Sequence, residues 1–262
     1  MTVAAYYERT PTGYRPTEYV TGPWNPDHCH AGPPAAILVG EIVAATPGMG
    51  VTRISFEIPR GIPKVPCAVR IEDLRPGKRI RLVRATLVGP DEDVLMAATA
   101  WCIRIAEEPL PEAPGEPIDV PLPDACEPLI FPFRDEMLGY MDGVEMRTAE
   151  GTPFGGGPAA IWIRQTIPLV DGEEEHPLTR LGLFGDLGNG ISAIARFDQL
   201  IAVNTDLTLY VARAPESAWV GMRSRTVTSG RGLGMTDSLV YDASGFAARA
   251  NQSIYFGRPG NS

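Results

Sequence analysis

The apolar positions of this chain form two helix-like stretches, each followed by four short strand-like runs. In residues 178–195 they recur at steps of three and four residues, which is the period of an α-helix. These positions are Leu178, Leu181, Phe184, Leu187, Ile191 and Ile194. Residues 34–45 are the other stretch, and Pro33 and Pro34 suit its first turn. We therefore predict one helix in each half of the chain.

Strand-like runs bounded by turn signals follow both helices. They cover residues 51–58, 67–74, 79–88 and 94–105 after the first helix, and residues 204–211, 219–227, 234–241 and 247–256 after the second. Residues 144–148 and 159–167 are two further candidate strands ahead of the second helix. An antiparallel sheet wrapped around a helix buries the apolar face of each, so this order indicates two α+β units.

A proline-rich, acidic stretch at residues 107–135 separates the halves and predicts an extended connector without a core of its own. We expect an N-terminal unit at 1–106 and a C-terminal unit at 136–262. When the two halves are aligned with an offset of 153 residues, Arg60 aligns with Arg213. The second half is one residue shorter in its final turn, so the offset after that turn is 152. A repeat of this length indicates a duplicated unit.

Composition excludes several classes of protein. The chain has 262 residues, a net charge of −9 and a pI near 4.9, so we expect neither nucleic acid nor an anionic membrane as partner. No apolar run approaches the ~20 residues of a membrane span. The first residues lack the order of a signal peptide. Four scattered cysteines without a CxxC pair favour free thiols and a cytoplasmic location.

The aligned halves differ in polarity at three positions. Asp186, Asn204 and Gln252 in the second half stand opposite Pro33, Val51 and Ala100 in the first. A carboxylate can take a proton from water, and two amides can hold that water, so such a trio could activate it for attack on a carbonyl. The simpler alternative is a carboxylate at a helix end, with amides that only satisfy backbone groups.

The motifs FGDLGNG, NTDLTLYV and RANQSIYF carry a resemblance to a known family. From about residue 23 to 256 the chain resembles the double hot-dog acyl-CoA thioesterases, in the actinobacterial thioesterase-like branch of the bacterial thioesterase II type. The resemblance implies a tandem hot-dog fold, a role in lipid metabolism, a homo-oligomer, and hydrolysis of acyl-CoA to fatty acid and CoA without a cofactor. It implies catalytic roles for Asp186 and Gln252, with Asn204 where the family has a threonine.

The loop before the first helix differs from the Gly-Gly pair of such enzymes. Gly32 keeps the close backbone approach, whereas Pro33 and Pro34 lack N–H groups that could bind an oxyanion. We expect Trp24 and His30 to line the mouth of the thioester channel. Gly32 and Thr205, beside Asn204, complete the expected substrate-binding residues.

Other functions remain compatible with the sequence. Replacement of the family threonine by Asn204 would suit a non-catalytic acyl-CoA or acyl-chain binding protein. A hot-dog hydratase or dehydratase would need a histidine near a carboxylate, and His30 with Glu41 is the pair that the sequence offers.

The run DHCH at 27–30 has no second ligand group at zinc-like spacing, so we expect no metal. Ser192 and Ser238 lack the G-x-S-x-G context of a serine hydrolase.

Overall fold

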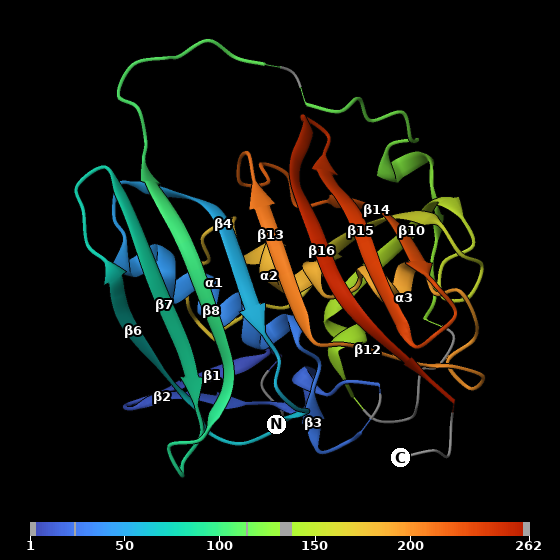
Figure 1. The fold of residues 1–262 in the computed structure, drawn as a ribbon, viewed down its shortest axis with the longest axis horizontal. Coiled ribbons are helices and arrows are strands. Elements are labelled where there is room, and N and C mark those ends of the chain that lie inside the picture. Colours follow the sequence, from blue (N-terminus) through green and yellow to red (C-terminus); the bar gives the residue numbers. More distant parts are fainter. Residues whose placement is uncertain (1–3, 24, 114, 132–137, 259–262) are drawn as a thin grey trace.

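The computed structural model describes residues 4–23, 25–113, 115–131 and 138–258. Within these residues twelve strands form one antiparallel sheet, with the α-helices on one of its faces (Figure 1). The strand order is β6-β7-β8-β4-β13-β16-β15-β14-β11-β10-β9, and β12 pairs with β16. Strands from the first half of the chain form one side of the sheet and strands from the second half form the other. The halves therefore share one continuous sheet.

The helices of the described residues are α1 (Gly32–Ala45), α2 (Thr179–Gly185) and α3 (Gly188–Ile191), with 3-10 turns η1 (Glu18–Val20), η2 (Pro123–Ala125) and η3 (Tyr140–Gly143). None of these helices is long and apolar enough to cross a membrane. The large sheet contains β4 (Met49–Glu57), β6 (Ala68–Arg75), β7 (Ile80–Val88), β8 (Val94–Arg104), β9 (Glu127–Pro128), β10 (Val144–Gly151), β11 (Ala159–Gln165), β12 (Ile201–Asn204), β13 (Asp206–Val211), β14 (Val220–Thr228), β15 (Leu233–Asp242) and β16 (Gly245–Gly257).

In the described part of the chain, four short strands lie outside the large sheet, namely β1 (Tyr7–Thr10), β2 (Gly13–Pro16), β3 (His28–Cys29) and β5 (Ile62–Pro63). β1 pairs with β2, and β3 pairs with β5. The sequence pattern did not predict them, because runs of two to four residues are too short for alternation of apolar and polar positions to be recognised.

The halves join where β4 pairs with β13. Ser55 lies opposite Thr208, and the Thr208 hydroxyl donates a hydrogen bond to Ser55 Oγ at 3.0 Å. The two residues are 153 positions apart, the offset that aligns the halves of the sequence. In a two-fold arrangement equivalent residues face each other at the axis. The chain is therefore an internal pseudo-dimer whose pseudo-two-fold axis passes between Ser55 and Thr208.

Helix α1 is the central helix of the first half. Nine of its 14 residues are buried, as expected for a helix that is apolar on nearly all sides. It contacts α2 closely at Gly182, where a Cβ atom would lie 2.9 Å from the backbone nitrogen of Ala36. A glycine at this position therefore permits the approach of the two helices.

The predicted helix of the second half is interrupted, so the prediction of one continuous helix over residues 178–195 was wrong. α2 ends at Gly185 and α3 begins at Gly188. Between them, the Leu187 N–H donates to the Phe184 carbonyl three residues back, which is the tighter 3-10 pattern. Asp186 stands at this interruption, and the periodic pattern could not show it because Asp186 and Leu187 keep helical dihedral angles.

The connector is also more structured than predicted. Trp162 Nε1 donates to the carbonyl oxygen of Pro121 at 2.7 Å, and β9 pairs with β10. Ile118 and Val120 pack against a cluster that contains Trp162 and Tyr241. The residues next to Trp162 and Tyr241 in their strands belong to the main core, and successive side chains of a strand point to opposite faces of the sheet. This cluster therefore lies on the face opposite the main core. The connector thus covers part of the outer face of the second half.

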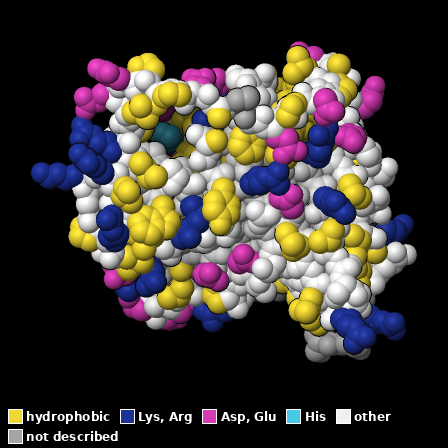
Figure 2. All heavy atoms as spheres, turned by 45° about the horizontal axis from the view of Figure 1, so that its top comes forward, with side chains coloured by type: hydrophobic (Ala, Val, Ile, Leu, Met, Phe, Trp, Pro, Cys, Tyr) yellow, Lys and Arg dark blue, Asp and Glu magenta, His cyan; other side chains and the backbone are white. Residues whose placement is uncertain are grey.

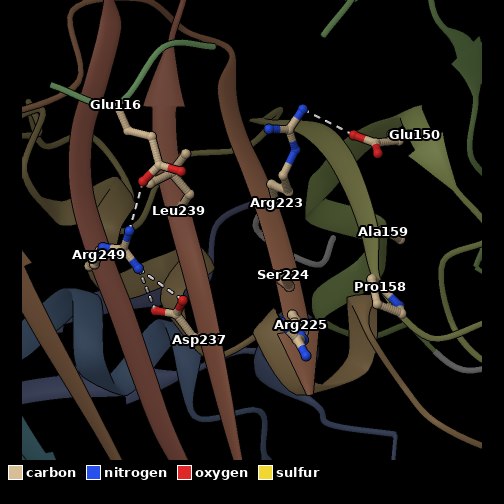
Figure 3. Close-up of a pocket in the computed structure, with 10 residues that line it drawn as sticks. All are labelled: Glu116, Glu150, Pro158, Ala159, Arg223, Ser224, Arg225, Asp237, Leu239 and Arg249. Atoms are coloured by element: carbon tan, nitrogen blue, oxygen red, sulfur yellow. Dashed lines mark hydrogen bonds and ion pairs between the residues drawn. The ribbon is translucent and has the colours of Figure 1, made fainter. Parts of the chain in front are cut away.

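Ion pairs also tie the connector to this face. Arg249 bonds Glu116 of the connector at 2.7 Å and Asp237 of β15 at 2.9 Å (Figure 3), and Arg223 bonds Asp119 of the connector at 2.7 Å. On the side of the molecule drawn in Figure 2, basic and acidic side chains are interspersed with hydrophobic ones. Exposed pairs of this kind are each worth less than about 1 kcal/mol, so packing and the Trp162 bond hold the connector more firmly.

Candidate active site

Asp186 projects from the interruption between α2 and α3, and 9% of its side-chain surface stays exposed. Asn204 Nδ2 donates to Asp186 Oδ1 at 2.6 Å, and Gln252 Nε2 approaches the same oxygen at 3.4 Å. Two amide donors from two strands therefore converge on one carboxylate oxygen. The second oxygen, Oδ2, faces His30 from the first half of the chain.

A β-bulge brings Asn204 to this position. Asn204 pairs with Ile254, whereas Thr208 pairs with Asn251, so the chain from β12 to β13 holds one more residue than β16 opposite it. Strict alternation would place Asn204 on the same face as the exposed Tyr210. The extra residue reverses the alternation and turns the amide of Asn204 toward the helices.

Gln252 is buried in the last strand and bridges the interruption of the second helix. Its Nε2 donates to the backbone carbonyl of Asp186 at 3.1 Å, and its Oε1 accepts from the Asn189 N–H at 3.0 Å. The carboxamide thus satisfies one backbone group on each side of the break. These bonds fix both its orientation and that of the turn that carries Asp186.

His30 is the partner of Asp186 across the two halves. Its Nε2 lies 3.5 Å from Asp186 Oδ2, and its Nδ1 accepts a hydrogen bond from the Gly32 N–H at 3.0 Å. Glu41, the carboxylate that the sequence offered as a partner for His30 in a hydratase, has other contacts. Glu41 instead accepts a hydrogen bond from the Tyr14 hydroxyl and lies 3.5 Å from Arg9. Helix spacing could not reveal a partner for His30 that belongs to the other half of the chain.

Tyr140 orients His30, and sequence reasoning missed it. The two rings stack with centroids 3.9 Å apart and planes only 6° apart. The Tyr140 hydroxyl donates to the Leu183 carbonyl at 2.8 Å, and burial raises its pKa well above the ordinary range, so it stays a donor. Nothing in the sequence marks Tyr140, because η3 is a short turn without a periodic pattern.

The remaining predicted substrate-binding residues differ in their placement. A Cβ atom on Gly32 would lie 2.3 Å from the Leu183 carbonyl oxygen, so this glycine does permit a close approach. Thr205 is exposed, and its backbone N–H and carbonyl bond Ser253 and Ile58. The structure therefore does not bring its side chain into the group around Asp186. Trp24 lies outside the described residues.

A row of buried hydroxyls runs from the sheet to α3. Oxygen distances are 2.8 Å between Thr236 and Thr226 and 2.7 Å between Thr226 and Ser192. Because Ser192 gives its one proton to the Gly188 carbonyl at 2.9 Å, Thr226 must donate to Ser192 and Thr236 to Thr226. Val83 is the residue of the first half aligned with Thr236. The same comparison of halves that identified Gln252 could thus have found Thr236.

Protonation of His30 is expected to destabilise the fold. Burial lowers the pKa of His30 below its ordinary value of about 6.5, against the opposing effect of Asp186. The stability gained from neutral His30 is therefore present above pH 6.5 and lost as the pH falls toward the lower pKa of the folded state. Thermal unfolding of wild type and His30→Gln between pH 7.5 and 5 measures this, with a smaller loss expected in the variant. Equal losses in both proteins would contradict it.

Comparison with protein families identifies the class of this chain. Residues 20–103 match the family described as acyl-CoA thioesterase N-terminal domain, and residues 123–256 match the acyl-CoA thioesterase C-terminal domain. The chain therefore belongs to the acyl-CoA thioesterase family, whose members hydrolyse thioesters. Among curated protein sequences, none matches it significantly.

Solved structures share its fold over nearly the whole chain. A hot-dog protein of unknown function from Alicyclobacillus acidocaldarius has a TM-score of 0.74 at 17% identity, covering 98% of this chain and 97% of that one. A tesB protein from Mycobacterium avium subspecies paratuberculosis has a TM-score of 0.67 at 17% identity, covering 96% of each chain. Acyl-CoA thioesterase II TesB2 from Mycobacterium marinum has a TM-score of 0.64 at 16% identity, covering 88% and 92%. At these identities the likeness establishes the fold alone, and the predicted tandem hot-dog fold of the α+β class is confirmed.

Proposed function

We propose that this protein hydrolyses an acyl-CoA thioester with a water molecule activated by Asp186. The water oxygen bonds to the thioester carbon while its proton passes to Asp186 Oδ2. The tetrahedral intermediate then collapses, the carbon–sulfur bond breaks, and the proton moves to the sulfur. The products are a fatty acid and CoA, and no covalent enzyme intermediate or cofactor is needed.

One observation carries this proposal, namely the convergence of the Asn204 and Gln252 amides on Oδ1 of Asp186. With Oδ1 engaged by two donors, the carboxylate is held in one orientation and Oδ2 is the oxygen available to a water. The simpler alternative for Gln252 is a structural role, since it also bonds two backbone groups of the helix. Both roles suit one side chain, because the same bonds that hold the turn also aim Asp186.

Asn204 is expected to replace the family threonine in function. A hydroxyl can donate to Asp186 as the amide does, so Asn204→Thr should keep kcat within about ten-fold. Asn204→Leu is close in volume but has no donor, and loss of a hydrogen bond to a charged group costs about 1.5–3 kcal/mol. Its kcat should fall by roughly 10- to 100-fold. A wild-type kcat in the leucine variant would exclude a catalytic role for the Asn204 amide.

A hydratase or dehydratase is the second candidate, and the approach of His30 to Asp186 is the observation that favours it. In such an enzyme the histidine would take a proton from the substrate carbon. Here Nδ1 accepts the Gly32 N–H, so the proton of the neutral ring lies on Nε2. The nitrogen that faces Asp186 then has no free lone pair, and we rank hydrolysis first.

A thiol-trapping assay with short, medium and long acyl-CoAs tests the proposal, and hydration of 2-enoyl-CoA is followed in parallel. Release of CoA at one or more chain lengths is the expected result. Binding of acyl-CoA without turnover at any length would instead favour a non-catalytic binding protein. Hydration without thiol release would favour the second candidate.

A further inference from the structure

We propose that His30 is a further catalytic residue, whose Nε2–H donates a hydrogen bond to the thioester carbonyl oxygen as that oxygen becomes an oxyanion. This role rests on the hydrolysis proposed above. It makes the active site a composite of the two halves, with the base from the second half and the oxyanion donor from the first. No proton is transferred from the imidazole, since the hydrogen bond alone stabilises the developing charge.

The neutral His30 ring carries its proton on Nε2. The Gly32 N–H can only donate, so Nδ1 must present a lone pair, and in a neutral imidazole the proton then resides on Nε2. Nε2 is also the nitrogen that faces Asp186 Oδ2 at 3.5 Å. Since burial lowers the pKa of His30, the ring is neutral at pH 7 and keeps this arrangement.

The first turn of α1 offers no competing donor. Helix N-termini often bind anions through free backbone N–H groups. In α1, Pro33 and Pro34 have none, the Gly32 N–H is bonded to His30, and the Ala35 N–H donates to the Ala31 carbonyl at 3.0 Å. The first four residues of this helix therefore have no free backbone N–H group. The Nε2–H of His30 can supply the donor that these four residues lack.

The His30 ring is held in a fixed position by its neighbours. Its backbone N–H donates to the Val20 carbonyl at 2.7 Å, and its face stacks on Tyr140. Tyr140 in turn is bonded to Leu183 through its hydroxyl, and its own carbonyl accepts from Tyr6 at 3.3 Å. A donor held in place in this way needs no reorganisation when charge develops on the substrate, which is what makes an oxyanion site effective.

The proposed positions also fit a single reacting centre. The oxygen of a water on Asp186 Oδ2 and a carbonyl oxygen on His30 Nε2 would both be bonded to the same carbon atom of the tetrahedral intermediate. The two protein atoms are 3.5 Å apart, and 9% of each side chain is exposed. Base and oxyanion donor are therefore close enough to serve one carbon atom.

Steady-state kinetics of His30→Phe with an acyl-CoA that wild type hydrolyses tests the inference. Phenylalanine keeps the flat ring that stacks on Tyr140 but removes the Nε2–H donor, together with the Nδ1 acceptor of the Gly32 N–H. We expect kcat to fall by about 10²–10³-fold with KM within a few-fold, the usual effect of losing one oxyanion donor. His30→Gln, which retains an N–H donor, should recover part of kcat. His28→Phe, two residues away on β3, is the matched control and should keep the wild-type kcat.

The outcomes separate this inference from the proposed function. A wild-type kcat in His30→Phe, together with an inactive Asp186→Asn, would overturn the role of His30 and leave the hydrolysis standing. Absence of thiol release by wild type would overturn both. Nitrogen NMR of the wild-type protein provides a test that does not depend on activity or on the folding of a variant. It should show a protonated Nε2 and an unprotonated Nδ1 for His30, and the reverse tautomer would refute the inference.

Discussion

Asp186→Asn is expected to lower kcat for acyl-CoA hydrolysis by about 10³-fold, within the range by which general bases contribute. Asparagine has nearly the same shape, and its carbonyl oxygen can still accept the Asn204 and Gln252 amides. It cannot take a proton from water, however, so the loss should appear in the chemical step. Binding of acyl-CoA should remain within a few-fold of wild type, since no predicted substrate contact is removed. Thiol trapping and calorimetric titration measure the two quantities.

Asp198→Asn is the matched control for this prediction. Asp198 is an exposed aspartate that pairs with Arg196 at 2.9 Å, and its loss should leave kcat within about two-fold. If Asp186→Asn released thiol at the wild-type rate, Asp186 would not be the base. If it lost binding and turnover together, its carboxylate would serve the substrate or the fold instead.

Gly182→Ala is expected to destabilise the protein by about 2 kcal/mol. The added Cβ would lie 2.9–3.0 Å from backbone atoms of Ala35 and Ala36. Backbone atoms in a packed core cannot move apart without a loss of stability. Alanine is the better helix former by up to about 1 kcal/mol, which offsets only part of the overpacking. For a chain of this size the midpoint of thermal unfolding should fall by roughly 4–8 °C.

Gly40→Ala is the control that measures the effect of helix propensity without a steric clash. Gly40 lies in α1, and its added Cβ would meet Thr179 Cγ2 at an ordinary contact distance of 3.6 Å. With no clash, the gain in helix propensity should raise the free energy of unfolding by about 0.5–1 kcal/mol. Thermal unfolding of both variants at one pH measures the difference. A stabilised Gly182→Ala would show that α1 and α2 can separate without cost.

Much of the fold could be predicted because it follows from local periodicity. Buried strands and the buried helix α1 obey the two- and 3.6-residue periods, and their bounds agree to within a few residues with the predicted ranges. The offset of 153 was visible in the turns, and it reappears in the structure as the pairing of Ser55 with Thr208. The short strands and the structured connector were missed because their contacts come from distant parts of the chain.

The candidate site was only partly visible. Asp186, Asn204 and Gln252 stood out because two halves with one fold differ there in polarity, and the structure brings their polar atoms within 2.6–3.4 Å. The same reasoning could not supply His30 as the partner of Asp186. A comparison between halves finds differences at equivalent positions, whereas the contact between His30 and Asp186 joins positions that are not equivalent.

By itself, the sequence determined that two similar α+β units follow one another and that the second holds three polar residues the first lacks. Hydrophobic periodicity and residue polarity are local properties, so a single chain read in order displays them. Only the tertiary structure decided that Asn204 turns inward at a bulge, that the second helix breaks at Asp186, and that His30 faces that carboxylate. These features depend on register and on packing between segments far apart in the chain, where the partner rather than the residue sets the geometry.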